Sequence, residues 1–130
     1  MATRVLVVDD DAMVLRATAR ILKRAGFDVT TSQTSDDALF ARSAQVRYGN
    51  AGGFGVDVVV SDLEMPGMHG DALCRAWREL DICPTPFILL SGSDTVFERA
   101  RACGARAAFA KPVDPGVLVE AVRDAAKEVR

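Results

Sequence analysis

The sequence predicts a single α/β domain in which helices cover both faces of a parallel sheet. Five short apolar runs alternate with five longer amphipathic runs along the chain. Apolar runs without polar alternation are typical of strands buried on both faces, and such strands occur almost only in parallel sheets. Right-handed crossovers then place helices on both faces. With 130 residues, 49% of them hydrophobic, the chain can bury one substantial core.

The first strand is predicted at residues 5–8, and it runs directly into Asp9, Asp10 and Asp11. Asp11 is a candidate N-cap for the helix that follows. Gly26 stands where a helix C-cap belongs. The apolar stripe of this helix is expected at three- and four-residue steps, on Val14, Ala17, Thr18, Ile21, Leu22 and Ala25.

A second strand is predicted at 27–31, and Ser35 is a candidate N-cap for a helix ending near Arg47. The Gly-rich segment 48–56 is expected to be an insertion before the third strand. It does not fit a phosphate-binding loop, because that loop needs a strand before it and a helix after it. The later elements are predicted as strands at 57–61, 87–90 and 107–110, and as helices at 70–80, 94–103 and 115–129.

Composition argues against several classes of function. A formal charge of −2 gives no electrostatic reason to expect nucleic acid or an anionic membrane as a partner. The sequence shows no membrane-span-like run and no signal segment. The cysteines Cys74, Cys83 and Cys103 lack Cys-x-x-Cys or Cys/His spacing, which predicts free thiols rather than disulfides or a zinc site. We therefore expect a cytoplasmic protein.

Four predicted strands end in residues that carry chemistry. Asp9 and Asp10 follow the first strand, Asp62 the third, Ser91 the fourth and Lys111 the fifth. In open α/β sheets these strand ends meet at one edge, where ligands bind. Two carboxylates about 4 Å apart repel by ~4 kcal/mol at an effective dielectric near 20, and a divalent cation removes that repulsion. Mg²⁺ favours oxygen ligands and sites that phosphate oxygens complete. The pattern therefore predicts a site for a metal and a phosphoryl group.

These residues resemble the receiver domain of response regulators in two-component signalling, over nearly the whole chain. The resemblance implies one receiver domain over residues 1–130. It also implies a flavodoxin-like (βα)5 fold, as in chemotaxis regulators, with a five-stranded sheet of order 2-1-3-4-5. The matching segments are Asp9-Asp10, Asp62 with Leu63-Glu64-Met65-Pro66-Gly67, Ser91-Gly92 and Lys111-Pro112.

The resemblance also implies roles. Asp62 is expected to be the phosphoacceptor, a nucleophile that forms an acyl phosphate. One Mg²⁺, for which Mn²⁺ could substitute, would be bound directly by Asp10 and Asp62, through water by Asp9 and through the backbone carbonyl of Glu64. The metal and Lys111 would position the phosphoryl group and neutralise its charge.

Further positions are expected to transmit or tune the signal. Ser91 would donate its hydroxyl to a phosphoryl oxygen and move toward it, and Gly92 has no side chain to crowd the phosphoryl group. Glu64 and Ser93 stand where receivers vary and tune the phosphoryl lifetime. Pro112 is expected to follow a cis peptide bond.

The output switch departs from the family pattern. Ala108 stands where receivers usually carry an aromatic switch residue. Phe109, the next residue, should point to the opposite side of the sheet and into the core. Phe97 is an alternative candidate for a partner contact. The basic residues of the first helix form either a solvated face or a docking site for the phosphodonor; they are Arg16, Arg20, Lys23 and Arg24.

The expected function is Mg²⁺-dependent phosphotransfer from a partner phosphohistidine to Asp62, which switches a protein-interaction surface. The chain would catalyse its own phosphorylation and dephosphorylation without being a conventional turnover enzyme. The donor would be a sensor histidine kinase or a histidine phosphotransfer protein, because His69 is the only histidine and has no ligand partner nearby. The effector is an unknown protein, and we expect a monomer or a phosphorylation-dependent dimer.

Two other classes remain as alternatives. One is a receiver-like binding module that works without phosphorylation. The other is a phosphatase of the haloacid-dehalogenase type, which also uses a strand-end aspartate, a hydroxyl, a lysine and Mg²⁺. Its metal-binding acids come late in the chain, whereas Asp9 and Asp10 come first. The end at Arg130, just after the last predicted helix, fits a stand-alone regulator or part of a longer protein.

Overall fold

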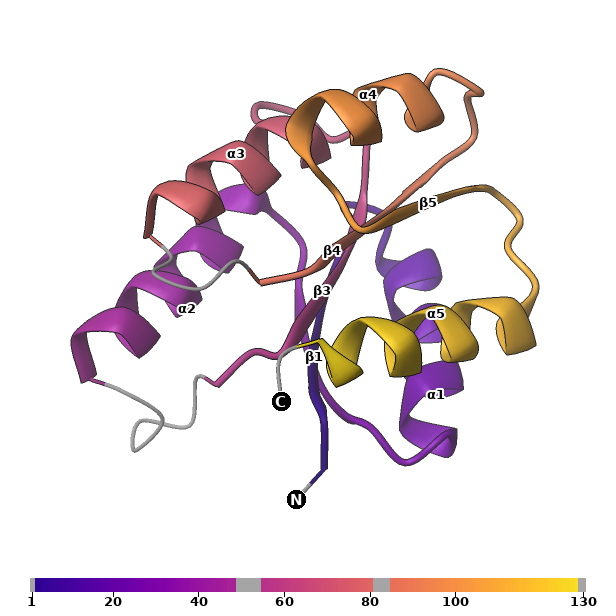
Figure 1. Ribbon diagram of the computed structural model, residues 1–130, viewed down its shortest axis with the longest axis horizontal. Coiled ribbons are helices and arrows are strands. Elements are labelled where there is room, and N and C mark those ends of the chain that lie inside the picture. The colour runs from indigo at the N-terminus through magenta and orange to yellow at the C-terminus, as the bar shows by residue number, and fades with distance from the viewer. Residues whose placement is uncertain (1, 49–54, 81–84, 129–130) are drawn as a thin grey trace.

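The computed structural model describes residues 2–48, 55–80 and 85–128, and within them five strands alternate with five helices (Figure 1). The predicted insertion at 48–56 falls mostly outside these residues. The strands are β1 (Arg4–Val8), β2 (Asp28–Ser32), β3 (Val58–Asp62), β4 (Phe87–Ser91) and β5 (Ala107–Ala110). The helices are α1 (Ala12–Arg24), α2 (Ser35–Tyr48), α3 (Gly70–Leu80), α4 (Val96–Cys103) and α5 (Pro115–Lys127).

The strands form one parallel sheet of order β2-β1-β3-β4-β5, which confirms the predicted fold class. α1 and α5 cover one face of the sheet, and α2, α3 and α4 cover the other (Figure 1). Val58 and Val60 of β3 pack with α1 and α5, whereas Val59 between them packs with the opposite helices. This alternation follows from the two-residue period of a strand.

The core on the α2–α3–α4 face is centred on Trp77. Its indole is fully buried and meets the ring of Phe87 edge-on, with ring centroids 5.5 Å apart. Cys74 and Cys103 are buried free thiols between α3 and α4, as predicted, and the Cys74 thiol donates to the backbone carbonyl of Cys103. Cys83 lies outside the described residues. Among the described helices, none is long and apolar enough to cross a bilayer.

The predicted stripe of α1 is confirmed in part: Thr18 and Leu22 are buried, and Val14, Ile21 and Ala25 are half-buried. The buried residues of α1 are Leu15, Thr18, Ala19 and Leu22, whereas Ala17 is exposed. Helical periodicity fixes the spacing of buried positions, but packing against the sheet decides which neighbouring positions, here Leu15 and Ala19 rather than Ala17, join the buried stripe. Gly26 follows the C-cap residue Ala25 and has the positive φ of 97° that glycine adopts without strain.

The predicted cap of α2 is also wrong. The backbone N–H of Asp37 donates to the hydroxyl of Thr34 at 3.1 Å, so Thr34 caps the helix. Ser35 is already helical and buried, and its hydroxyl donates to the backbone carbonyl of Met68 at 2.8 Å. The side chain predicted to cap α2 therefore ties α2 to the loop between β3 and α3.

Candidate phosphoacceptor and metal site

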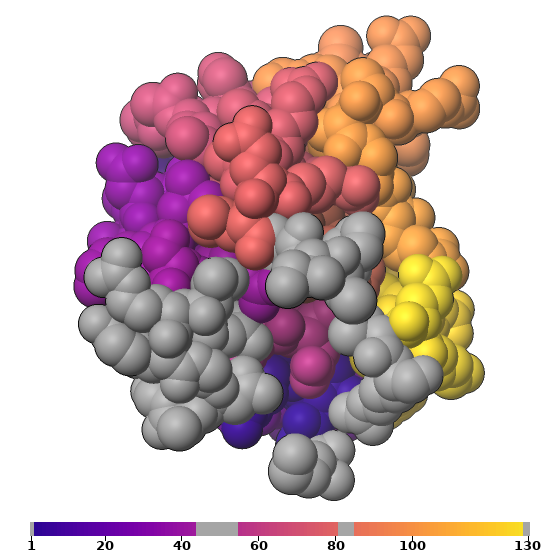
Figure 2. All heavy atoms as spheres, turned by 60° about the vertical axis from the view of Figure 1, so that its left-hand side comes forward, coloured from indigo at the N-terminus to yellow at the C-terminus, as the bar shows by residue number. Residues whose placement is uncertain are grey.

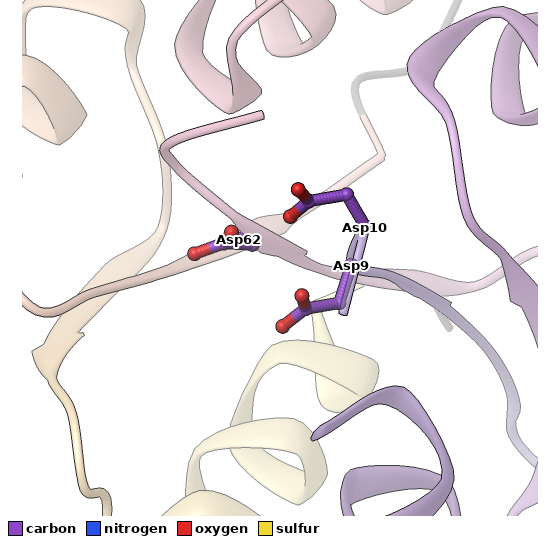
Figure 3. Close-up of side chains that lie close together, drawn as sticks. All are labelled: Asp9, Asp10 and Asp62. Carbon is purple, nitrogen blue, oxygen red and sulfur yellow. The ribbon is translucent and has the colours of Figure 1, made fainter. Parts of the chain in front are cut away.

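Asp9, Asp10 and Asp62 come together at the carboxyl ends of β1 and β3, where the sequence placed them. One carboxylate oxygen from each lies within 4.8 Å of the others. Figure 3 shows the three side chains directed into the same space. The register explains this placement, because Val8 pairs with Ser61 and so brings Asp9, which follows β1, beside Asp62, the last residue of β3. Asp9 and Asp62 are buried, whereas Asp10 is exposed.

Asp11 does not join the acidic cluster. Its carboxylate accepts hydrogen bonds from the backbone N–H groups of Met13 at 2.9 Å and Val14 at 3.3 Å, which makes it the N-cap of α1. Its own backbone N–H donates to the carboxylate of Asp9 at 2.9 Å. The N-cap residue of α1 therefore also helps to orient Asp9.

Lys111 reaches the cluster from the end of β5. Its ammonium lies 3.1 Å from a carboxylate oxygen of Asp9 and 3.0 Å from one of Asp62. Its backbone N–H donates to the carbonyl of Ser91 at 2.7 Å, which holds the end of β5 against β4. The Lys111–Pro112 peptide bond is cis, as the resemblance implies.

The electrostatics of the cluster favour a further cation. Burial raises the pKa of Asp62, and the negative charges of Asp9 and Glu64 add to this rise against the opposing effect of Lys111. Burial would lower the pKa of Lys111, but its hydrogen bonds and attraction to Asp62 and Asp9 raise it overall. One ammonium cannot neutralise three clustered carboxylates.

The donor set fits a divalent cation of the Mg²⁺ or Mn²⁺ type. Three carboxylates supply hard oxygen ligands close together, one of them exposed at the mouth of the site. Such cations accept oxygen ligands and leave positions for water or phosphate oxygens. The cluster is therefore a candidate site for such a cation.

Ser91 closes β4 next to this site and is fully buried. Its hydroxyl donates to the carboxylate of Glu64, with oxygen–oxygen distances of 2.5 and 2.7 Å, and accepts a hydrogen bond from the backbone N–H of Ser93 at 3.0 Å. Sequence reasoning placed Ser91 at the site but missed its bond to Glu64. At Gly92, an added Cβ would meet nothing within 4 Å.

A family model for the response regulator receiver domain matches residues 5–123. The chain belongs to the response regulator receiver family. Receiver domains act in two-component systems and are not conventional enzymes.

Known proteins agree with this assignment over nearly the full chain. The receiver is 34% identical to the C4-dicarboxylate transport transcriptional regulatory protein DctD of Rhizobium meliloti, over 99% of this chain and 26% of that protein. It is 27% identical to the transcriptional regulatory protein ResD of Bacillus subtilis, over 93% of this chain and 47% of that protein. The chain thus spans less than half of each of these relatives.

Solved receivers share the fold. A CheY-like receiver domain protein from Methanospirillum hungatei superposes with a TM-score of 0.81 at 26% identity, over 98% of this chain and 96% of that chain. A receiver protein from Burkholderia phymatum gives a TM-score of 0.77 at 32% identity, over 96% and 95% of the two chains.

Gly70 is a packing requirement that the sequence did not reveal. A Cβ at this position would lie 2.3 Å from the backbone carbonyl oxygen of Asp62. The backbone N–H of Gly70 donates to the carbonyl of Leu63 at 2.8 Å. The absence of a side chain therefore lets α3 begin directly against the end of β3, beside the phosphoacceptor candidate.

A half-buried ion pair joins α3 to α4, which lie against each other in Figures 1 and 2. Arg99 donates two hydrogen bonds of 2.9 Å to the carboxylate of Asp71. Burial would raise the pKa of Asp71, but the hydrogen bonds and charge of Arg99 lower it overall. Sequence analysis did not find this pair, since nothing local links residues 28 positions apart.

Strand β5 carries Ala108 at the position where the resemblance leads one to expect an aromatic residue. Ala108 is half-buried and packs in the core between the sheet and α2, α3 and α4. Phe109 is half-buried and packs in the core on the other face of the sheet, as strand alternation predicts. Phe97 of α4 is 48% exposed. His69 is exposed. The four basic residues of α1 are also exposed, and together with Leu15, Ala19 and Thr31 they line a pocket; they are Arg16, Arg20, Lys23 and Arg24.

Proposed function

We propose that this receiver accepts a phosphoryl group on Asp62 from a partner phosphohistidine, in a Mg²⁺-dependent reaction. The observation that carries the proposal is the meeting of Asp62 with two further carboxylates and the ammonium of Lys111 at one sheet edge. A carboxylate in such a setting can act as a nucleophile toward phosphorus.

The chemistry requires little beyond positioning and charge neutralisation. A carboxylate oxygen of Asp62 forms a bond to phosphorus while the bond from phosphorus to the donor imidazole nitrogen breaks, and the imidazole leaves. Lys111, already 3.0 Å from Asp62, would stabilise the negative charge of the phosphoryl oxygens. Water can later hydrolyse the acyl phosphate and restore Asp62.

The metal would be held by Asp10 and Asp62 directly, by Asp9 through water and by the backbone carbonyl of Glu64. When bound, it supplies positive charge that neutralises the acids and the incoming phosphoryl oxygens. The exposed position of Asp10 and the burial of Asp9 and Asp62 suit a site that opens on one side.

The hydroxyl of Ser91 is proposed to donate a hydrogen bond to a phosphoryl oxygen. This bond would couple the site to α4 through the loop containing Gly92 and Ser93. Glu64 and Ser93 are proposed to tune the lifetime of the phosphoryl group. We propose that Glu64 limits access of the hydrolytic water. An unchanged dephosphorylation rate in Glu64→Ala would rule out this role.

The proposed donor is a sensor histidine kinase or a histidine phosphotransfer protein, since histidine kinases are the partners that receiver relatives imply. The proposed output is an altered contact with a protein effector, by a monomer or a phosphorylation-dependent dimer. The buried free thiols of Cys74 and Cys103 suit a reducing compartment, so we place the exchange in the cytoplasm.

Intact mass spectrometry tests this proposal. The protein is incubated with acetyl phosphate, with and without Mg²⁺, beside Asp62→Asn and the control Asp94→Asn, in which an exposed acid is replaced. We expect one phosphoryl adduct that needs Mg²⁺ and is lost only in Asp62→Asn. Sustained phosphate release would instead favour a phosphatase, and no adduct would favour a phosphorylation-independent binding module.

A further inference from the structure

The hydroxyl of Ser91 already has hydrogen-bond partners in this structure. It donates to Glu64 at 2.5 and 2.7 Å from the two carboxylate oxygens and accepts from the backbone N–H of Ser93. A serine hydroxyl has one proton to donate. A phosphoryl oxygen on Asp62 and the carboxylate of Glu64 would therefore compete for the same proton.

Phosphorylation would also repel Glu64 electrostatically. The phosphoryl group brings about −1.5 to −2 charges to the site. The carboxylate of Glu64 already lies close enough to Asp62 to help raise the pKa of that residue. Loss of the Ser91 hydrogen bond and stronger repulsion act in the same direction, so both displace Glu64.

Arg99 is the candidate cation for the displaced carboxylate. It belongs to α4, its side chain is 34% exposed, and Glu64 contributes to the raised pKa of its guanidinium after the larger effect of Asp71. Asp71 holds two of the N–H donors of Arg99, and a guanidinium has five. Arg99 can therefore donate hydrogen bonds to a second carboxylate while it keeps those to Asp71.

We propose that Glu64 carries the phosphorylation signal to α4 in place of an aromatic switch. Without phosphate, the carboxylate of Glu64 accepts the hydrogen bond from the hydroxyl of Ser91. With a phosphoryl group on Asp62, a phosphoryl oxygen accepts that hydrogen bond instead, and Glu64 pairs with Arg99. This inference rests on the proposed function of Asp62. It gives the receiver a readout that needs no bulky side chain at Ala108.

A double-mutant cycle tests the competition for Ser91. The affinity for beryllofluoride, a phosphoryl analogue, is measured by ¹⁹F NMR in Mg²⁺ buffer for wild type, Glu64→Ala, Ser91→Ala and the double variant. Glu64→Ala removes the charged competitor for the hydrogen bond from Ser91, so it should tighten beryllofluoride binding by about fivefold when Ser91 is present. In the Ser91→Ala background the gain should fall below about twofold, because only charge repulsion remains.

The control is Glu98→Ala, which removes an exposed acid from α4 next to Arg99. We expect it to leave the affinity unchanged. An equal gain for Glu64→Ala in both serine and alanine backgrounds, or a matching gain for Glu98→Ala, would overturn the inference. Absence of beryllofluoride binding to wild type would refute the proposed function of Asp62 and this inference with it.

The second step is read at Arg99 itself. The Nε–H resonance of Arg99 should shift when beryllofluoride binds to wild type, and the shift should be lost in Glu64→Ala although that variant binds the analogue. A structural role for Glu64 would not predict this loss. An equal shift in both proteins would show that Glu64 does not reach Arg99.

Discussion

Replacing Asp62 by asparagine should stabilise the fold in the absence of Mg²⁺. The substitution keeps the shape of a buried side chain but removes one of three clustered negative charges. A residue kept for folding would show the opposite effect. The prediction therefore separates a site built for a ligand from a structural cluster of acids.

The magnitude follows from the distances. At an effective dielectric near 20, Asp62 repels Asp9 and Asp10 by at least ~3.5 kcal/mol each, since the oxygens lie within 4.8 Å of one another. Its attraction to Lys111 at 3.0 Å is worth ~5.5 kcal/mol on the same basis. The net relief is about 1.5 kcal/mol, which raises the melting temperature of a domain of this size by about 5 °C.

The stability that Asp62→Asn gains over wild type should increase as the pH rises. The pKa of Asp62 is raised in the folded protein, so the unfolded chain ionises more readily and the fold loses stability as the pH rises above the ordinary value of 3.8. Asp62→Asn should therefore match wild type below that pH and exceed it at neutral pH. Thermal unfolding in chelator, followed by circular dichroism from pH 3 to 7, measures the difference.

Asp57→Asn is the matched control, because Asp57 immediately precedes β3 at the end far from the cluster. Its carboxylate accepts a hydrogen bond from the backbone N–H of Arg4 at 2.9 Å, so its replacement should give no gain. Added Mg²⁺ should stabilise wild type far more than Asp62→Asn. A destabilised Asp62→Asn, or an equal effect of Mg²⁺ on both proteins, would refute the electrostatic reasoning.

Three further substitutions give distinct outcomes. Lys111→Met should lower the free energy of unfolding in chelator by about 2 kcal/mol, because it leaves buried acids unpaired. The same substitution should tighten Mg²⁺ binding in a calorimetric titration, and weaker Mg²⁺ binding would contradict this. Asp71→Asn should cost about 1 kcal/mol at neutral pH, because it removes the charge from the hydrogen bonds to Arg99, whose side chain is a third exposed. The pKa of Asp71 is lowered by folding, so this cost should begin to shrink as the pH falls below 3.8 and should vanish only below the lowered pKa of the folded protein; a pH-independent cost would contradict it. Ser35→Ala should cost about 1 kcal/mol in denaturant unfolding by removing the donor to Met68, and no change would show that the contact contributes nothing.

The sequence was sufficient for the fold and for the location of the site. Apolar runs without alternation identified a parallel sheet, and the carboxyl ends of parallel strands necessarily share one edge. Asp9, Asp62 and Lys111 each stand at such an end, so their meeting follows from topology alone. The same geometry brought Asp10 into the cluster.

The contacts between side chains could not be predicted in the same way. Ser35 fits the composition of a cap, but the hydroxyl of Thr34 takes that role because Ser35 is already inside the helix and packs against a loop 33 residues away. The bond between Ser91 and Glu64 likewise depends on how the loop after β3 folds over the end of β4. Such partners are set by tertiary packing rather than by local pattern.

The most direct test of the central claim is to trap the phosphoryl group chemically. Borohydride reduces an aspartyl phosphate to homoserine, and peptide sequencing by mass spectrometry then locates the altered residue. After incubation with acetyl phosphate and Mg²⁺, we predict homoserine at position 62 alone. Homoserine at Asp9 or Asp10, or no reduction product in a protein that carries the adduct, would contradict Asp62 as the phosphoacceptor.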